Sequence, residues 1–203
     1  MTEERRRHRR ALALLWVTLA WNVAEGAIAI SAGAVAGSVA LVAFGLDSFI
    51  EVTAAGVLIW RLGAGDGDQS ERRERAAHRV IGATFIALAL YIGAQAAYVL
   101  PTGASPETSP VGLGLAAASL AVMPALGLVK RSNARKLGSS ALIAESTETL
   151  VCSYLSLTLL IGLAANAAFG WWWADIAAAL AMLPWIVREG AEGLRGDACE
   201  EES

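Results

Sequence analysis

The chain has 203 residues, of which 56% are hydrophobic and only 17% charged. Its mean hydropathy is +0.51, and its net charge of −3 comes from charges that are segregated along the chain. A soluble domain of this size carries more charge. The composition therefore excludes a soluble domain and indicates an integral membrane protein. We expect it to lie in the lipid bilayer and to bind no nucleic acid.

Long uncharged stretches predict the architecture. No Asp, Glu, Lys or Arg occurs in residues 80–106, 108–129 or 149–174, and apolar runs of this length are typical of membrane spans. We predict an all-α integral membrane protein with six transmembrane helices. In chain order the spans cover about residues 11–30, 38–62, 78–100, 110–129, 139–165 and 171–187, in one domain (11–190) between a basic N-terminus (1–10) and a short acidic tail (191–203).

The first apolar run follows a basic segment, and a signal peptide has the same pattern. The run continues past Glu25 toward the second span without a convincing cleavage site. We therefore interpret it as a retained first helix.

The positive charges predict the orientation in the membrane. With six spans, all 16 Lys and Arg residues fall on one side, in the termini and in the links after the second and fourth spans. Basic loops stay in the cytoplasm, so we expect a multi-pass protein of the cytoplasmic (inner) membrane with both termini cytoplasmic. Trp171–Trp173 then lies at the outer interface, where indole rings prefer to lie.

Two acidic faces occur within the spans. Asp47 and Glu51 lie one helical turn apart in the second span, and Glu148 and Cys152 do so in the fifth. Carboxylates at that depth need a partner, a proton or a cation, and no Lys or Arg accompanies them at mid-span. We predict that the two faces meet and hold a metal ion; the alternative is a set of protonated or capped acids between helices. Three carboxylates and a thiol suit zinc, with cadmium, cobalt, iron(II) and manganese left open.

Three further acids lie within the spans. For Glu145 we expect one of two kinds of role. It either takes part in metal transport, as an extra ligand, as a group that orients a ligand or as a proton carrier, or it serves only packing and hydrogen bonding. We expect Glu25 and Asn22, with Gln95 of the third span, to form hydrogen bonds between helices, and Asp175 to cap the start of the sixth helix. A role in proton coupling or beside the ligands is the alternative for Glu25 and Asp175.

The glycines and cysteines have simpler interpretations. Gly33 and Gly37 have the spacing of a helix-contact motif, but they fall in the predicted link between the first two spans, so we expect them to shape a tight loop. Two cysteines do not make a disulfide framework. We expect Cys152, inside a span, and Cys199, in the tail, to be free thiols.

The stretches around the acids resemble the cation diffusion facilitator family of divalent-metal/proton antiporters. Residues 37–51 (GSVALVAFGLDSFIE) resemble its second span, residues 140–152 (SALIAESTETLVC) its fifth, and Trp173–Asp175 the start of its sixth. The resemblance covers about residues 11–190 and implies the family's six-span fold. The 16 residues after Val187 are too few for the family's cytoplasmic metal-binding domain, so we expect that domain to be missing and leave a homodimer open.

The resemblance also assigns positions. It places Asp47 and Glu51 on the family's two metal-binding acids of the second span. In the fifth span, Glu148 stands where the family usually has His, Cys152 where it has Asp, and Glu145 on a preceding Asp. The implied site is more anionic than usual and contains sulfur.

These observations predict a secondary transporter, not an enzyme. We expect it to export a divalent transition-metal cation, zinc foremost, in exchange for protons by alternating access, without a tightly bound cofactor. Two other classes stay open. One is a non-transporting membrane scaffold or assembly partner, and the other is a membrane metalloenzyme with Glu145 as general base, which no hydrolase signature supports.

Overall fold

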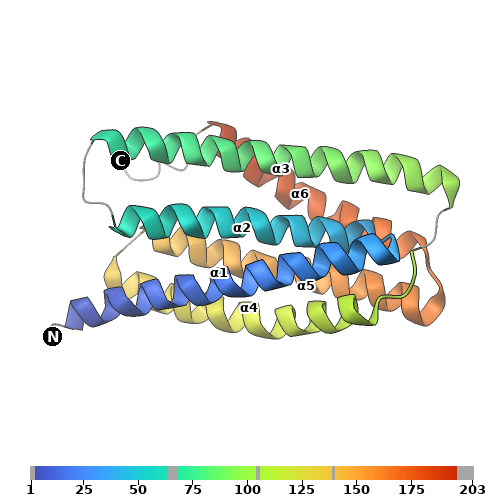
Figure 1. Ribbon diagram of the computed structural model, residues 1–203, viewed down its shortest axis with the longest axis horizontal. Coiled ribbons are helices and arrows are strands. Elements are labelled where there is room, and N and C mark those ends of the chain that lie inside the picture. The colour runs from blue at the N-terminus through green and yellow to red at the C-terminus, as the bar shows by residue number, and fades with distance from the viewer. Residues whose placement is uncertain (1–2, 64–67, 104–105, 139, 196–203) are drawn as a thin grey trace.

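The structure is a computed structural model that describes residues 3–63, 68–103, 106–138 and 140–195. Within these ranges the chain forms α-helices joined by short links and no strand, which confirms the predicted fold class. The helices are α1 (Glu3–Ala36), α2 (Val39–Gly63), α3 (Asp68–Thr102), α4 (Pro110–Leu137), α5 (Ser140–Phe169) and α6 (Trp173–Arg195) (Figure 1).

The helices form a four-helix bundle with a helix pair beside it (Figure 1). α1 packs on α2 and α4, and α5 packs on α4 and α2, which closes the bundle. α3 packs mainly on α6, and this pair meets the bundle through α2 and α5. Successive helices run in opposite directions, so α6 runs back toward the end at which α1 begins. The two helices with the predicted ligands, α2 and α5, are therefore direct neighbours.

Five of the six helices are long and apolar enough to cross a membrane. α6 is not among them, because its second half is rich in charged residues. It still lies alongside the other helices over much of the bundle (Figure 1), as the predicted sixth span requires. The five spans in the described part of the chain are Arg6–Ala36, Val39–Ile59, Gly82–Thr102, Pro110–Leu137 and Glu145–Phe169.

The helices extend into segments predicted as links, and this changes the role of one glycine. α1 continues to Ala36. Gly37 follows with φ +67°, a left-handed conformation that suits glycine, and forms the predicted turn. The prediction was wrong for Gly33, which lies within α1. A Cβ atom there would stand 2.8 Å from the backbone nitrogen of Val42, so Gly33 allows close contact between α1 and α2.

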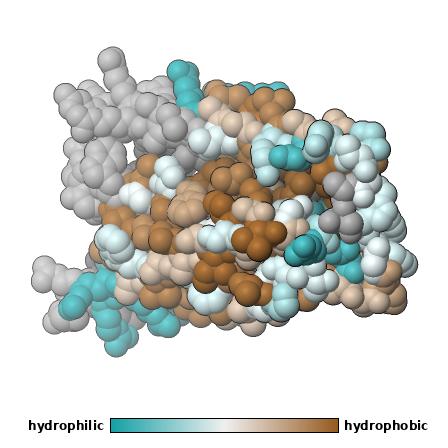
Figure 2. All heavy atoms as spheres, turned by 45° about the vertical axis from the view of Figure 1, so that its right-hand side comes forward, coloured by the Kyte–Doolittle hydropathy of each residue, from teal (hydrophilic) through white to brown (hydrophobic). Residues whose placement is uncertain are grey.

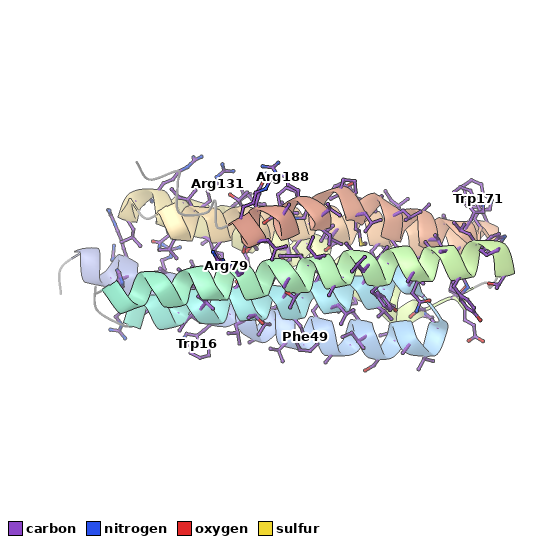
Figure 3. The ribbon with its side chains drawn as sticks, turned by 90° about the horizontal axis from the view of Figure 1, so that it is seen from above. Trp16, Phe49, Arg79, Arg131, Trp171 and Arg188 are labelled. Atoms are coloured by element: carbon purple, nitrogen blue, oxygen red, sulfur yellow. The ribbon has the colours of Figure 1, made fainter. Side chains whose placement is uncertain are left out.

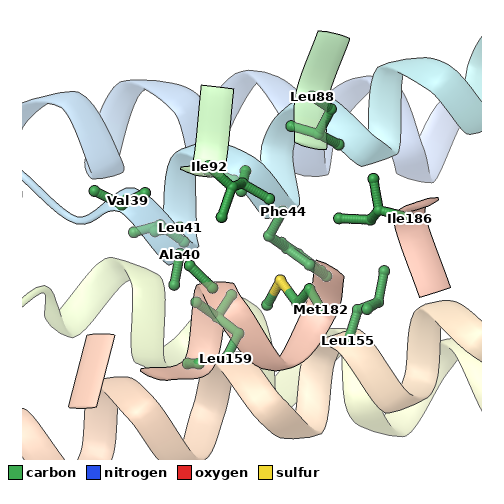
Figure 4. Close-up of a cluster of buried hydrophobic side chains, with 14 of the residues drawn as sticks. Val39, Ala40, Leu41, Phe44, Leu88, Ile92, Leu155, Leu159, Met182 and Ile186 are labelled. Carbon is green, nitrogen blue, oxygen red and sulfur yellow. The ribbon is translucent and has the colours of Figure 1, made fainter. Parts of the chain in front are cut away.

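A well-packed apolar core lies where α2, α3, α5 and α6 meet. Phe44 of α2 is fully buried, and Ile92, Leu155 and Met182 from the other three helices surround it (Figure 4). In a bilayer such contacts act through van der Waals packing rather than exclusion of water. Because Phe44 precedes Asp47 by about one turn, this core also fixes the direction in which α2 presents Asp47.

The surface agrees with a membrane environment. Hydrophobic residues cover much of the middle of the visible face (Figure 2). Among the exposed residues of the chain, the side chains of Leu90, Leu128 and Ile161 are 69%, 61% and 60% exposed. Soluble monomers seldom leave so many large apolar side chains uncovered, whereas lipid solvates them.

The two ends of the bundle differ in chemistry. Arg79 and Arg131 lie toward one end, and Trp171 lies at the other (Figure 3). The Trp171 ring stacks on that of Trp173 with 5.3 Å between centroids, and both rings are about half exposed. This polarity is the one expected for a basic inner face and an aromatic outer face. The assignment of these faces to the cytoplasm and the exterior stays a prediction.

Candidate metal centre

The four predicted ligands line the same cavity. It measures about 20 Å³, enough for one water molecule or a single ion. Apolar side chains of α2, α3, α5 and α6 close most of its wall. Its polar lining comes from Asp47 and Glu51 of α2, Glu148 and Cys152 of α5, and Glu189 of α6.

α2 presents both of its acids to this cavity. Asp47 is only 4% exposed and makes no hydrogen bond or ion pair with any other described residue. Glu51 accepts a 2.6 Å hydrogen bond from Nδ2 of Asn22 on α1. A buried carboxylate without a partner is strongly unfavourable unless a proton or a cation meets it. Asp47 is therefore the clearest indication of a cation site.

α5 adds sulfur and a further carboxylate. Cys152 is completely buried and forms no disulfide, which confirms the expected free thiol; Cys199 lies outside the described residues. The thiol lies within interaction range of Glu51 across the α2–α5 contact. Glu148 lies one turn earlier on the same wall. Thiolate and carboxylate donors together suit zinc and softer divalent ions better than magnesium or calcium.

The cavity concentrates negative charge. Glu51 lies within electrostatic range of Asp47 and Glu148, and both of these lie within range of Glu189. None of the described residues in its wall is a Lys or Arg. A mostly apolar cavity that is also lined by carboxylates attracts cations and repels anions.

The donors do not yet form a coordination shell. Across the described ranges, no three His, Cys, Asp or Glu side chains are placed so that they could hold a metal ion together. Cation binding here would therefore require these side chains, or α2 and α5 themselves, to move closer together.

Sequence reasoning missed Glu189, which it left beyond the end of the sixth span. Burial raises the pKa of the Glu189 carboxyl above its ordinary value, and the charge of nearby Glu192 raises it further. The signal was available in the periodicity of α6. Glu189 falls seven residues after Met182 and three after Ile186, on the helix face that carries these two buried residues, and is itself half-buried.

Glu145 lies outside this cavity. It is buried and accepts a hydrogen bond from Nζ of Lys130 on α4, which also donates to Oγ1 of Thr149 at 2.9 Å. The expectation that no base accompanies the acids was wrong here. Lys130, predicted to lie in a basic link, lies in α4 and is itself buried. This ion pair supports a packing and hydrogen-bonding role for Glu145.

Glu25 and Asn22 form contacts between helices, as predicted. Oε2 of Glu25 accepts a 3.3 Å hydrogen bond from Ser48 of α2, and Asn22 donates to Glu51 as described above. Gln95 differs, because its side chain interacts with Tyr91 one turn earlier on α3. Neither Glu25 nor Gln95 is part of the cavity wall.

Asp175 caps a different helix from the one predicted. Its carboxylate accepts hydrogen bonds from Oγ of Ser38 and from the backbone N–H groups of Val39, at 2.8 Å, and Ala40, at 3.3 Å. Its hydrogen bonds thus go to the start of α2 rather than to its own helix, α6. A carboxylate is favourable at a helix N-terminus because of the helix dipole. Asp175 therefore ties α6 to α2.

A comparison with protein families gives a match over most of the chain. Residues 15–195 match the family model described as the cation efflux transmembrane domain. The matched range reaches from α1 to the last residue of α6 and includes every residue that lines the cavity.

Proposed function

Because the chain belongs to the cation efflux family, we propose that this metal-cation transporter moves its substrate through the cavity between α2 and α5. The substrate is a divalent transition metal, zinc foremost. The direction is export from the cytoplasm, and protons move in exchange. Asp47, Glu51, Glu148 and Cys152 bind the ion.

One observation carries the proposal: the four predicted donors line a single cavity in which Asp47 has no partner among the described residues. Structural ion pairs would place a base beside the acids, as Lys130 does for Glu145. Lys130 also lies within electrostatic range of Glu148, but no Lys or Arg among the described residues lines this cavity, and its acids lie within electrostatic range of one another. A cation relieves that repulsion.

The donor set supports zinc as the preferred ion. Zinc is bound tetrahedrally by thiolate, imidazole and carboxylate groups, and three carboxylates with one thiol complete such a set. The sulfur disfavours magnesium and calcium, which prefer oxygen ligands.

Proton exchange follows from the same chemistry. Carboxyl and thiol groups must lose their protons to bind a metal ion, so metal arriving from the cytoplasm displaces protons, and protons arriving from outside displace the metal. The site is then exposed to each side in turn. Because the donors are divided between α2 and α5, a small relative movement of these helices changes the number of donors in reach.

The test is zinc uptake into everted membrane vesicles, whose outer surface is the cytoplasmic face. Wild-type protein should accumulate zinc when the lumen is acidic, and a protonophore should abolish the accumulation. Asp47→Ala and Glu148→Ala should remove it. Glu192→Ala, which changes an exposed acid paired with Arg188, should not. Transport by the first two variants at the wild-type rate would refute the site.

A further inference from the structure

Glu189 adds a third helix to the cavity. The four proposed donors come from α2 and α5, whereas Glu189 comes from α6 and lies within electrostatic range of Asp47 and Glu148. It makes no hydrogen bond or ion pair with another described residue. The cavity therefore holds a fourth carboxylate for which the proposed site has no role.

The packing of α6 explains why Glu189 faces this way. The next residue, Gly190, faces α3, where a Cβ atom would stand 2.7 Å from Cδ1 of Ile86. Gly82 of α3 approaches α6 just as closely, because a Cβ there would meet the backbone nitrogen of Leu194 at 2.7 Å. Successive helical residues differ by about 100°. With Gly190 turned to α3, Glu189 turns toward α2 and α5.

The neighbouring base Arg188 is not ion-paired with Glu189. Arg188 donates a 2.7 Å hydrogen bond from Nε to Oε1 of Glu192, and its guanidinium lies 5.7 Å from the ring centre of Trp185. It lies at the outer edge of α6 (Figure 3). The hydrogen bond to Glu192 raises the pKa of Arg188 further above its already high value. Arg188 still lies within electrostatic range of Glu189, but its hydrogen bond goes to Glu192, and neither a hydrogen bond nor an ion pair joins it to the Glu189 carboxylate.

Asp47 gives independent support for a cation in this cavity. It is only 4% exposed and has no hydrogen-bond or ion-pair partner among the described residues. We therefore propose that Glu189 is a further ligand of the transported cation, supplied by α6. This inference rests on the proposed function. A fifth donor exceeds what tetrahedral zinc needs, whereas manganese(II) prefers more ligands and oxygen donors. Glu189 thereby widens the site to accept manganese(II) beside zinc.

The experiment measures equilibrium binding of zinc and of manganese(II) to purified full-length protein in detergent. Glu189→Gln removes the charge and one oxygen donor, and Glu189→Asp keeps both. Glu107→Gln is the control, because it neutralises an exposed acid that does not line the cavity. We expect Glu189→Gln to weaken manganese binding about tenfold or more and zinc binding about threefold or less. Glu189→Asp should recover most of the manganese affinity, and Glu107→Gln should match the wild type.

The outcomes separate a ligand from a distant charge. An equal loss for both ions would show an electrostatic effect alone and overturn the inference, as would unchanged binding in Glu189→Gln. Wild-type protein that binds zinc but no manganese would also overturn it, while leaving the proposed function intact. Wild-type protein that binds neither ion would overturn the proposed function itself.

Discussion

Asn22 of α1 donates a 2.6 Å hydrogen bond from Nδ2 to Oε2 of Glu51 on α2. Asn22 is completely buried, and Glu51 is half-buried, so the bond is partly shielded from water. It fixes one oxygen of Glu51 and leaves the carboxylate on the wall of the cavity. Replacing a group that orients a metal ligand in this way typically lowers metal affinity by about 10-fold to 100-fold.

Replacing Asn22 should therefore weaken zinc binding through Glu51. We expect Asn22→Leu, which keeps the volume and removes the donor, to lower zinc affinity about 10-fold to 100-fold, as measured by competition with a fluorescent chelator. In a Glu51→Gln background the same change should have little further effect, because the two side chains act as one unit. Equal losses in both backgrounds would show that Asn22 does not act through Glu51.

The close approach of α1 and α2 depends on Gly45. A Cβ atom at this position would lie 2.9 Å from both the Cβ of Ala29 and the backbone nitrogen of Ile30, and backbone atoms cannot easily give way. Gly45→Ala should lower the stability of the protein by about 1–3 kcal/mol, seen as a lower Tm in detergent. Gly56→Ala is the control on the same helix, because a Cβ atom there would have no neighbour within 4 Å. A Tm for Gly45→Ala equal to that control would contradict the tight packing.

The buried pair of Lys130 and Glu145 should respond differently to single and double substitution. Lys130→Met leaves an uncompensated buried carboxylate, which is destabilising by about 3–5 kcal/mol. Lys130→Met combined with Glu145→Leu removes both charges and should recover most of the loss in Tm. The double variant should still bind zinc. Loss of zinc binding in a stable double variant would show that Glu145 belongs to the metal site.

Asp175 should stabilise the start of α2 without touching the cation. Asp175→Ala removes the acceptor for Ser38 and for two backbone N–H groups, and we expect a loss of about 1–2 kcal/mol. Asp175→Asn keeps one oxygen acceptor and should lose less. Thermal unfolding followed by circular dichroism measures both, with the exposed acid Glu107 changed to Ala as control. A larger loss for Asn than for Ala would contradict the capping role.

Local patterns were sufficient to predict the helices and which acidic residues share a helix face. The spans follow from uncharged runs, and the pairs Asp47–Glu51 and Glu148–Cys152 follow from the helical period, which puts residues four apart on one face. The two pairs reach the same cavity because α2 and α5 are in contact. The sequence indicated this contact only by placing energetically costly carboxylates in both spans.

The remaining features depend on contacts between distant segments. The sequence pattern predicts that Lys130 lies in a basic link. In the structure α4 extends past Lys130 and packs on α5, so that Lys130 pairs with Glu145. The sequence pattern predicts that Asp175 caps its own helix. In the structure the start of α6 meets the start of α2, and Asp175 accepts its hydrogen bonds there. In the sequence Glu189 falls beyond the predicted sixth span. In the structure α6 packs closely on α3 at Gly190, and this contact turns Glu189 toward the cavity. Single-residue patterns cannot predict such pairings, since each depends on which helices become neighbours.

The most direct test of the central claim is X-ray absorption spectroscopy at the zinc edge of the zinc-loaded protein, in a Cys199→Ser background. If Asp47, Glu51, Glu148 and Cys152 surround the ion, the spectrum should show one sulfur at about 2.3 Å and oxygens at about 2.0–2.2 Å. Cys152→Ser should remove the sulfur contribution, and Asp47→Ala should lower the amount of bound zinc. A ligand shell of oxygen and nitrogen alone in the protein with Cys152 intact would contradict the account.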